Sequence, residues 1–309
     1  MSRRAGVCDD LAMLTSQLCT LESLRSPALR SWGDRLRPMW DPDGTDPKEM
    51  IVHRKMWEWL FICEALAERD MLRPGRSGIG FGVGKEPLVA LFAGEGCRVL
   101  ASDLHPDRAA ASGWTESGAE YASGLEGLNG FGLCDPDDFA RLVSYRDIDM
   151  TDLPDDLGGF DFSWSSCAFE HLGSLEAGAR FVVEQMRLVR PGGVAVHTTE
   201  CNVSSDVDTV ESGGTVLFRR RDLDDLAGRL RTLGYAITLD LSGGTLPEDL
   251  HVDVPPFSDV HLRTTLGEYV TTSVALVVTK PADWAPPPTG LGARLRRRLP
   301  GQARPASGV

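Results

Sequence analysis

Glycine is unusually dense between residues 77 and 88, which read SGIGFGVGKEPL. Gly80, Gly82 and Gly84 form a G-x-G-x-G pattern directly after an apolar run. We therefore predict a loop that follows a strand and lets a ligand approach the backbone closely. Lys85 stands where a dinucleotide-binding loop needs its third glycine, and no G-K-[ST] phosphate loop is present. The alternative interpretation is a tight turn whose glycines only allow the strand and the next helix to pack closely.

Two acidic positions further along the chain add ligand-binding side chains. Asp103 lies nineteen residues after Gly84, at the end of a second apolar run, where a carboxylate can accept hydrogen bonds from both hydroxyls of a ribose. Asp149 and Met150 end a third run and offer an acceptor for an adenine amine and an apolar surface for its ring. A loop for an amino-acid portion, an acid for a ribose and this pair for adenine together predict that the chain binds S-adenosylmethionine.

These positions require a sheet whose strands end at one edge. Apolar runs separated by helical stretches predict parallel strands with crossover helices at 76–81, 97–102, 143–148, 159–164 and 193–199. Helices are predicted at 48–71, at 174–190 with Ser174 as its cap, and at 222–233 with Asp222 as its cap. The last two runs, 235–241 and 269–280, have no helix between them and are predicted as antiparallel neighbours at one sheet edge.

Residues 76–280 resemble class I S-adenosylmethionine-dependent methyltransferases. The motifs occur in the family's order, and the segments FDFSWSSCAFEHLG and LVRPGG are similar to those of the family. The resemblance implies an α/β fold with a Rossmann-like seven-stranded sheet in the order 3-2-1-4-5-7-6, its last strand antiparallel, and helices on both faces. Residues 1–75 are then an N-terminal helical extension, and residues 281–309, rich in Pro, Gly and Arg, are predicted to be a disordered basic tail.

The resemblance also assigns cofactor-binding residues. Gly80, Phe81 and Gly82 would hold the methionine part, Asp103 with the adjacent Leu104 the ribose, and Asp149 and Met150 the adenine, while Ser165 would line the same pocket through its backbone. The family usually has an acidic residue two positions before the first loop glycine, and this sequence has Gly78 there. The contact that such a residue supports to the ligand's amino group must then come from elsewhere.

The predicted activity is methyl transfer to an oxygen of a small or medium hydroxylated acceptor, such as a sugar or a secondary metabolite. His171, after the fourth strand, is the candidate general base, and Glu200, at the end of the fifth, is the candidate for orienting the acceptor. An alternative role for His171 is to line the cofactor pocket. No metal ligand is assigned, although a weaker hypothesis groups Glu200, His251, Asp253 and His261 around a divalent ion.

Two other function classes stay open. One is a binding module that keeps the cofactor site without catalysis. The other, less favoured, is a nicotinamide-dependent oxidoreductase. Lys85 breaks the dinucleotide pattern, and none of the four tyrosines is followed four residues later by a lysine.

Composition limits the partners further. The 309 residues include 45 acidic and 32 basic side chains, a formal charge of −13, which argues against a nucleic-acid partner. The seven cysteines form no C-x-x-C pair, which favours a reducing compartment over a disulfide or zinc scaffold. No stretch approaches the roughly 20 apolar residues that span a bilayer. We therefore expect a cytoplasmic protein, not inserted in a membrane, that acts on a small molecule.

Overall fold

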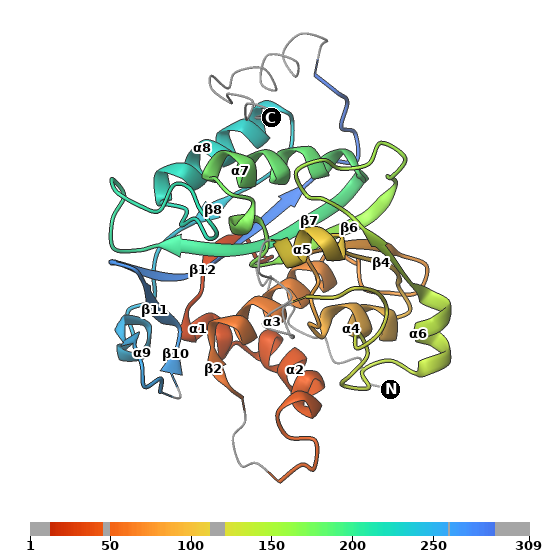
Figure 1. Cartoon of the computed structure of the whole chain (residues 1–309), viewed down its shortest axis with the longest axis horizontal. Coiled ribbons are helices and arrows are strands. Elements are labelled where there is room, and N and C mark those ends of the chain that lie inside the picture. Colours follow the sequence, from red (N-terminus) through yellow and green to blue (C-terminus); the bar gives the residue numbers. More distant parts are fainter. Residues whose placement is uncertain (1–12, 46–49, 112–120, 259, 288–309) are drawn as a thin grey trace, which may run out of the picture.

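The predicted parallel strands are present in the computed structural model, which describes residues 13–45, 50–111, 121–258 and 260–287. These strands lie side by side in the order β5-β4-β3-β6-β7. Their bounds are β3 Ser77–Phe81, β4 Arg98–Asp103, β5 Val143–Asp147, β6 Phe160–Ser166 and β7 Val189–Asn202. Helices cover both faces of the sheet (Figure 1), so the α/β class and the Rossmann-like layering are confirmed.

The other half of the sheet differs from the predicted order. As expected, β12 (Tyr269–Thr279) pairs antiparallel with β7, but β1 (Ser16–Leu18) lies between β12 and β8 (Leu239–Asp240). The predicted order 3-2-1-4-5-7-6 is therefore interrupted by a strand from the N-terminal region. Segments 235–241 and 269–280 meet directly at the bridge between Ala236 and Thr279 and are otherwise separated by β1.

Backbone hydrogen bonding explains why so short a strand is held there. The Ser16 N–H donates to the Thr238 carbonyl (3.0 Å), and the Val277 N–H donates to Ser16 Oγ (2.8 Å). β9 (Val252–Asp253) and β11 (Arg263–Leu266) also join this sheet, which has ten strands among the described residues. A separate pair is formed by β2 (Val52–His53) and β10 (Val260–His261).

Two layers of helices bury the two faces of the sheet. α7 (Leu175–Glu184) and α8 (Arg220–Thr232) lie on one side, and α2 (Pro27–Leu36), α3 (Arg54–Ala67) and α4 (Leu88–Gly94) lie on the other (Figure 1). The shorter helices are α1 (Leu21–Leu24), α5 (Pro106–Ala111), α6 (Pro136–Leu142) and α9 (Pro247–Leu250). In the described ranges, no helix combines the length and apolar character that crossing a membrane requires.

Several predicted element ends shift. Ser174 caps α7 as expected, with its Oγ accepting from the Ala177 N–H (3.1 Å), but the helix ends at Glu184 and a 3-10 turn, η4 (Gln185–Arg187), follows. Asp222 is not the N-cap of α8, because this helix begins at Arg220. The carboxylate of Asp222 instead accepts from the Arg219 N–H (2.9 Å). The helix expected over 48–71 is α3, preceded by β2.

Parts of the predicted extension and tail fall outside the described residues, namely 1–12, 46–49 and 288–309. Within the extension, the described residues before 45 include a strand, β1, as well as the helices α1 and α2. Within the tail, Trp284 stacks on Tyr235 with ring centroids 5.5 Å apart, and its indole N–H donates to the Leu233 carbonyl (2.8 Å). The first residues after β12 therefore pack on the domain.

Candidate cofactor and active site

The three glycines of the G-x-G-x-G pattern serve two different purposes: Gly80 lies in β3, and Gly82 and Gly84 follow it. Gly82 and Gly84 have φ angles of +56° and +51°, a left-handed conformation that favours glycine. A Cβ on Gly80 would lie 2.4 Å from Cζ2 of Trp164 on β6, so that glycine is required by packing. The close-packing interpretation therefore explains Gly80, while the loop geometry explains the next two glycines. Phe81, the last residue of β3, is fully buried.

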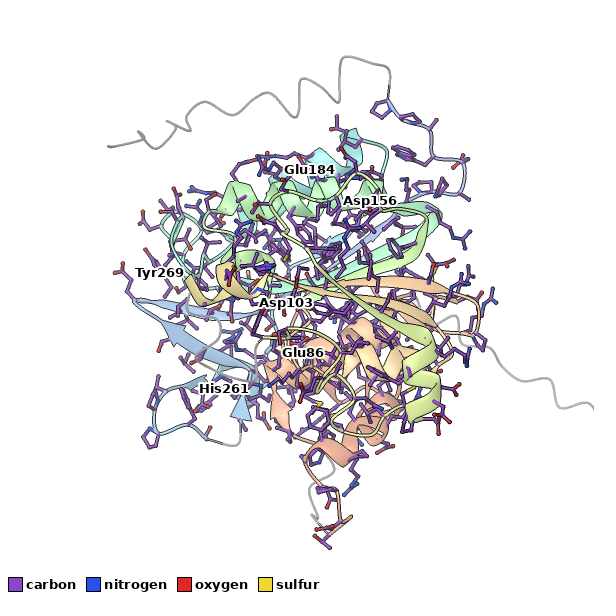
Figure 2. All side chains as sticks on the ribbon, turned by 45° about the vertical axis from the view of Figure 1, so that its right-hand side comes forward. Glu86, Asp103, Asp156, Glu184, His261 and Tyr269 are labelled. Carbon is purple, nitrogen blue, oxygen red and sulfur yellow. The ribbon has the colours of Figure 1, made fainter. Side chains whose placement is uncertain are left out.

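Asp103 ends β4 beside this loop and is 8% exposed. One carboxylate oxygen accepts from the Leu104 N–H (2.8 Å), and the other accepts from the N–H groups of Gly84 (3.1 Å) and Ala122 (3.2 Å). Burial raises the pKa of Asp103, although these three hydrogen bonds act in the opposite direction. Asp103, labelled in Figure 2, thus ties the glycine loop to the segment after residue 120.

The pair predicted for adenine lies just beyond β5. Asp149 accepts from the N–H and hydroxyl of Thr151 (2.8 and 2.7 Å) and forms an ion pair with Arg108. Burial would raise the pKa of Asp149, but the bonds from Thr151 and Arg108 outweigh it and lower the pKa. The sulfur of Met150 lies 3.8 Å from where a Cβ on Gly82 would be. The structure therefore brings Met150 to the glycine loop.

Ser165 and His197 form a buried pair on neighbouring strands β6 and β7. Ser165 Oγ and His197 Nδ1 are 2.8 Å apart, and both residues have no exposed surface. Burial lowers the pKa of His197 to about 3, so the ring is neutral, and its Nε2 has no hydrogen-bond partner. His197 is a core histidine. Ser165 can contact a ligand only through its backbone if the surrounding core stays in place, as the resemblance implies.

The two candidate catalytic residues have different surroundings. His171 ends the 3-10 turn η3 (Phe169–His171) after β6, and its Nδ1 donates to the Gly214 carbonyl (2.8 Å). Since a carbonyl can only accept, the acceptor nitrogen of the neutral ring is Nε2. Glu200 on β7 is 7% exposed, forms an ion pair with Arg54 from α3 and accepts from the Thr271 hydroxyl (2.6 Å).

Glu200 also meets two residues of the turn after β6. The sulfur of Cys167, one carboxylate oxygen of Glu170 and one of Glu200 lie within 4.8 Å of one another. Arg54 already places a cation against Glu200, which weakens the case for a metal ion there. Of the four residues in the metal hypothesis, His261 Nδ1 lies 2.7 Å and His251 Nε2 3.8 Å from the Asp253 carboxylate, whereas Glu200 is held by Arg54.

Sequence reasoning missed a charged group that joins α3 to the segment after β3. We name it the Lys55 cluster, and it consists of Lys55 and Glu58 on α3 and of Glu86. Lys55 Nζ lies 3.3 Å from the Glu58 carboxylate and 3.0 Å from that of Glu86. Glu58, 1% exposed, also accepts from Ser166 (3.1 Å), Thr198 (3.1 Å), Cys167 (3.2 Å) and Ser273. Burial would raise the pKa of Glu58, but Lys55, Arg54 and these bonds lower it to about 2. The one signal in the sequence is an acid between two tryptophans in an apolar helix.

The comparisons with known proteins agree with this site. A family model described as a methyltransferase domain matches residues 79–197. No curated protein sequence matches the chain. Among solved structures, the chain is similar to phosphoethanolamine N-methyltransferase 2 of Haemonchus contortus in complex with S-adenosyl-L-methionine. The identity is 16%, the match covers 53% of this chain and 34% of that one, and the TM-score is 0.36.

Two further structures match over more of their length. A TehB-like SAM-dependent methyltransferase from Corynebacterium glutamicum is 14% identical, with 82% of this chain and 97% of that chain covered and a TM-score of 0.39. A S-adenosylmethionine-dependent methyltransferase from Clostridium acetobutylicum is 11% identical, with 81% and 98% covered and a TM-score of 0.40. Residues 79–197, which match the methyltransferase-domain model, contain the glycine loop, Asp103 and the Asp149–Met150 pair. The positions predicted to bind the cofactor therefore lie in the part of the chain that is similar to a methyltransferase domain.

Proposed function

We propose that the protein transfers the methyl group of S-adenosylmethionine to a hydroxyl of a small or medium acceptor, such as a sugar or a secondary metabolite. One observation carries the choice of a hydroxyl. Around Glu200, two buried atoms find no hydrogen-bond partner among the described residues: Nε of Arg54, a donor, and Oε1 of Glu170, an acceptor. A hydroxyl can accept from the first and donate to the second, so one acceptor oxygen would satisfy both buried groups.

The roles that we propose for His171 and Glu200 follow from their hydrogen bonds. The bound cofactor supplies an electrophilic methyl group, so the protein has to align the acceptor and remove its proton. The bond from Nδ1 of His171 to the Gly214 carbonyl orients the ring with Nε2 as its basic nitrogen. Nε2 would take the hydroxyl proton as the oxygen attacks in line, and Glu200, fixed by Arg54 and Thr271, would accept a hydrogen bond from the acceptor.

The test is methyl transfer from S-adenosylmethionine labelled at the methyl group. The purified protein is incubated with a panel of sugars, glycosides and phenols and a matched panel of their amino analogues, and the products are separated by chromatography. We expect label in an ether product. Transfer to the amines alone would refute the choice of acceptor. Saturable cofactor binding without transfer to any compound in the panels, or to the small molecules of a cell extract, would favour the binding module instead.

A further inference from the structure

Gly78 cannot carry the acidic side chain that the family usually places at this position. A Cβ on Gly78 would lie 2.2 Å from Cε2 and 2.3 Å from Cζ of Phe162, a fully buried ring on β6. No carboxylate fits there without moving that ring. The ammonium group at the methionine end of the cofactor therefore needs a different anionic partner.

The Lys55 cluster lies at the correct edge of the sheet for this purpose. Glu86 comes directly after the glycine loop of β3, and Lys55 Nζ donates to the carbonyl (3.3 Å) and hydroxyl (3.2 Å) of Ser166, the last residue of β6. β3 and β6 are neighbouring parallel strands. The cluster thus places one cation and two carboxylates at the carboxyl ends of these two strands.

Strand order gives the direction in which the cofactor runs. Along β5-β4-β3-β6, the carboxyl ends carry the Asp149–Met150 pair, then Asp103, then the glycine loop, then the Lys55 cluster. A ligand whose adenine and ribose lie at the first two positions continues across the loop and ends at the fourth. Its free amino-acid group, one ammonium and one carboxylate, would meet one cation and two carboxylates there.

Burial separates the roles within the cluster. The side chain of Glu58 is 1% exposed and receives bonds from several hydroxyl and thiol donors, so it is already satisfied and serves to hold Lys55. The side chains of Lys55 and Glu86 are 33% and 15% exposed and remain accessible to a ligand. If their mutual ion pair opens, each can pair with the opposite charge of the ligand, and no charge is left without a partner.

We propose that Lys55 binds the carboxylate of the methionine portion of S-adenosylmethionine and that Glu86 binds its ammonium group. This rests on the proposed cofactor site and assigns its amino-acid end to Lys55 of α3 and to Glu86, two residues after Gly84. The N-terminal region is then part of the cofactor site.

The experiment compares two ligands by calorimetry: S-adenosylhomocysteine, and 5′-methylthioadenosine, which lacks the amino-acid group. Lys55→Met and Glu86→Gln should each weaken S-adenosylhomocysteine binding about 10- to 100-fold, because each removes a charge-assisted contact, and should leave 5′-methylthioadenosine binding within about 2-fold. Lys85→Met, an exposed lysine next to Glu86, is the matched control and should change neither. Unchanged affinity for S-adenosylhomocysteine in both variants, or equal losses for both ligands, would overturn the proposal.

A second measurement uses only the wild-type protein, so it does not depend on whether a variant folds. Wild-type protein should bind an S-adenosylhomocysteine analogue without the carboxyl group about 10-fold or more weakly than S-adenosylhomocysteine itself. Equal affinities would overturn the role of Lys55. Failure of the wild-type protein to bind any of these ligands is a different result, because it would refute the cofactor site as a whole.

Discussion

Replacing Glu58 with glutamine removes the charge at the centre of the Lys55 cluster and changes the shape of the side chain very little. The ionised carboxylate of Glu58 is stabilised by Lys55, Arg54 and four neutral donors, which lower its pKa from an ordinary 4.5 to about 2. Each pKa unit corresponds to about 1.4 kcal/mol. The folded state therefore favours the ionised side chain by about 3 kcal/mol, and Glu58→Gln should lower the free energy of unfolding by about this amount at pH 7.

The lowered pKa of Glu58 also determines how its stabilisation depends on pH. Because the pKa of Glu58 is lower in the folded than in the unfolded chain, its stabilisation is complete above pH 4.5 and is lost as the pH falls towards 2. The difference between wild type and Glu58→Gln should therefore stay near 3 kcal/mol from pH 7 to pH 5 and shrink to about 1 kcal/mol at pH 3.

Urea unfolding followed by tryptophan fluorescence at pH 7, 5 and 3 measures this difference. The matched control is Glu64→Gln on the same helix, where the carboxylate accepts from the Trp32 indole N–H (2.8 Å) and a glutamine oxygen can do the same. The control should cost less than about 1 kcal/mol, because the glutamine oxygen keeps the hydrogen bond from Trp32. A loss below about 1 kcal/mol for Glu58→Gln at pH 7, or a difference that does not shrink between pH 5 and pH 3, would refute the reasoning.

Three further variants and one control test the site and the packing next to it. Asp103→Asn should weaken S-adenosylhomocysteine binding about 10- to 100-fold in calorimetry, and wild-type affinity in the folded variant would contradict its role at the ribose. His171→Ala should lower turnover about 100- to 10,000-fold with unchanged cofactor affinity; near-normal turnover would remove it as the base. Gly78→Ala should cost about 1–3 kcal/mol in urea unfolding through its clash with Phe162, while Gly228→Ala on α8, where a Cβ meets nothing within 4 Å, should stabilise by about 0.5–1 kcal/mol.

The parallel strands were predictable because each is a local pattern. β3, β4, β6 and β7 are buried over most of their length, which is typical of strands covered by helices, and each corresponds to a short apolar run in the sequence. The cap of α7 was equally local, since it depends on Ser174 and the next turn of chain. The spacing after the glycine loop also predicted that Asp103 ends its strand, and Asp103 is the last residue of β4.

What escaped prediction depends on residues far apart in the chain. β1 has only three residues, Ser16–Leu18, which is too short to show a period of two. Its place is decided by its bonds to Thr238 and Val277. Similarly, a charged residue in a helical pattern is expected to face water, and Glu58 is buried only because β6, β7 and β12 all contribute donors to it.

The position of β1 has a consequence for the order in which the chain folds. Ser16 is bonded to Val277, 261 residues away. During synthesis, residues 16–18 leave the ribosome early, but both strands that flank them are made near the end. The parallel strands and their crossover helices can assemble first, whereas β1 and the buried carboxylate of α3 must wait for β12. Such distant pairings slow folding, so the N-terminal region should become protected from proteases only after β12 has been made and has paired with β1.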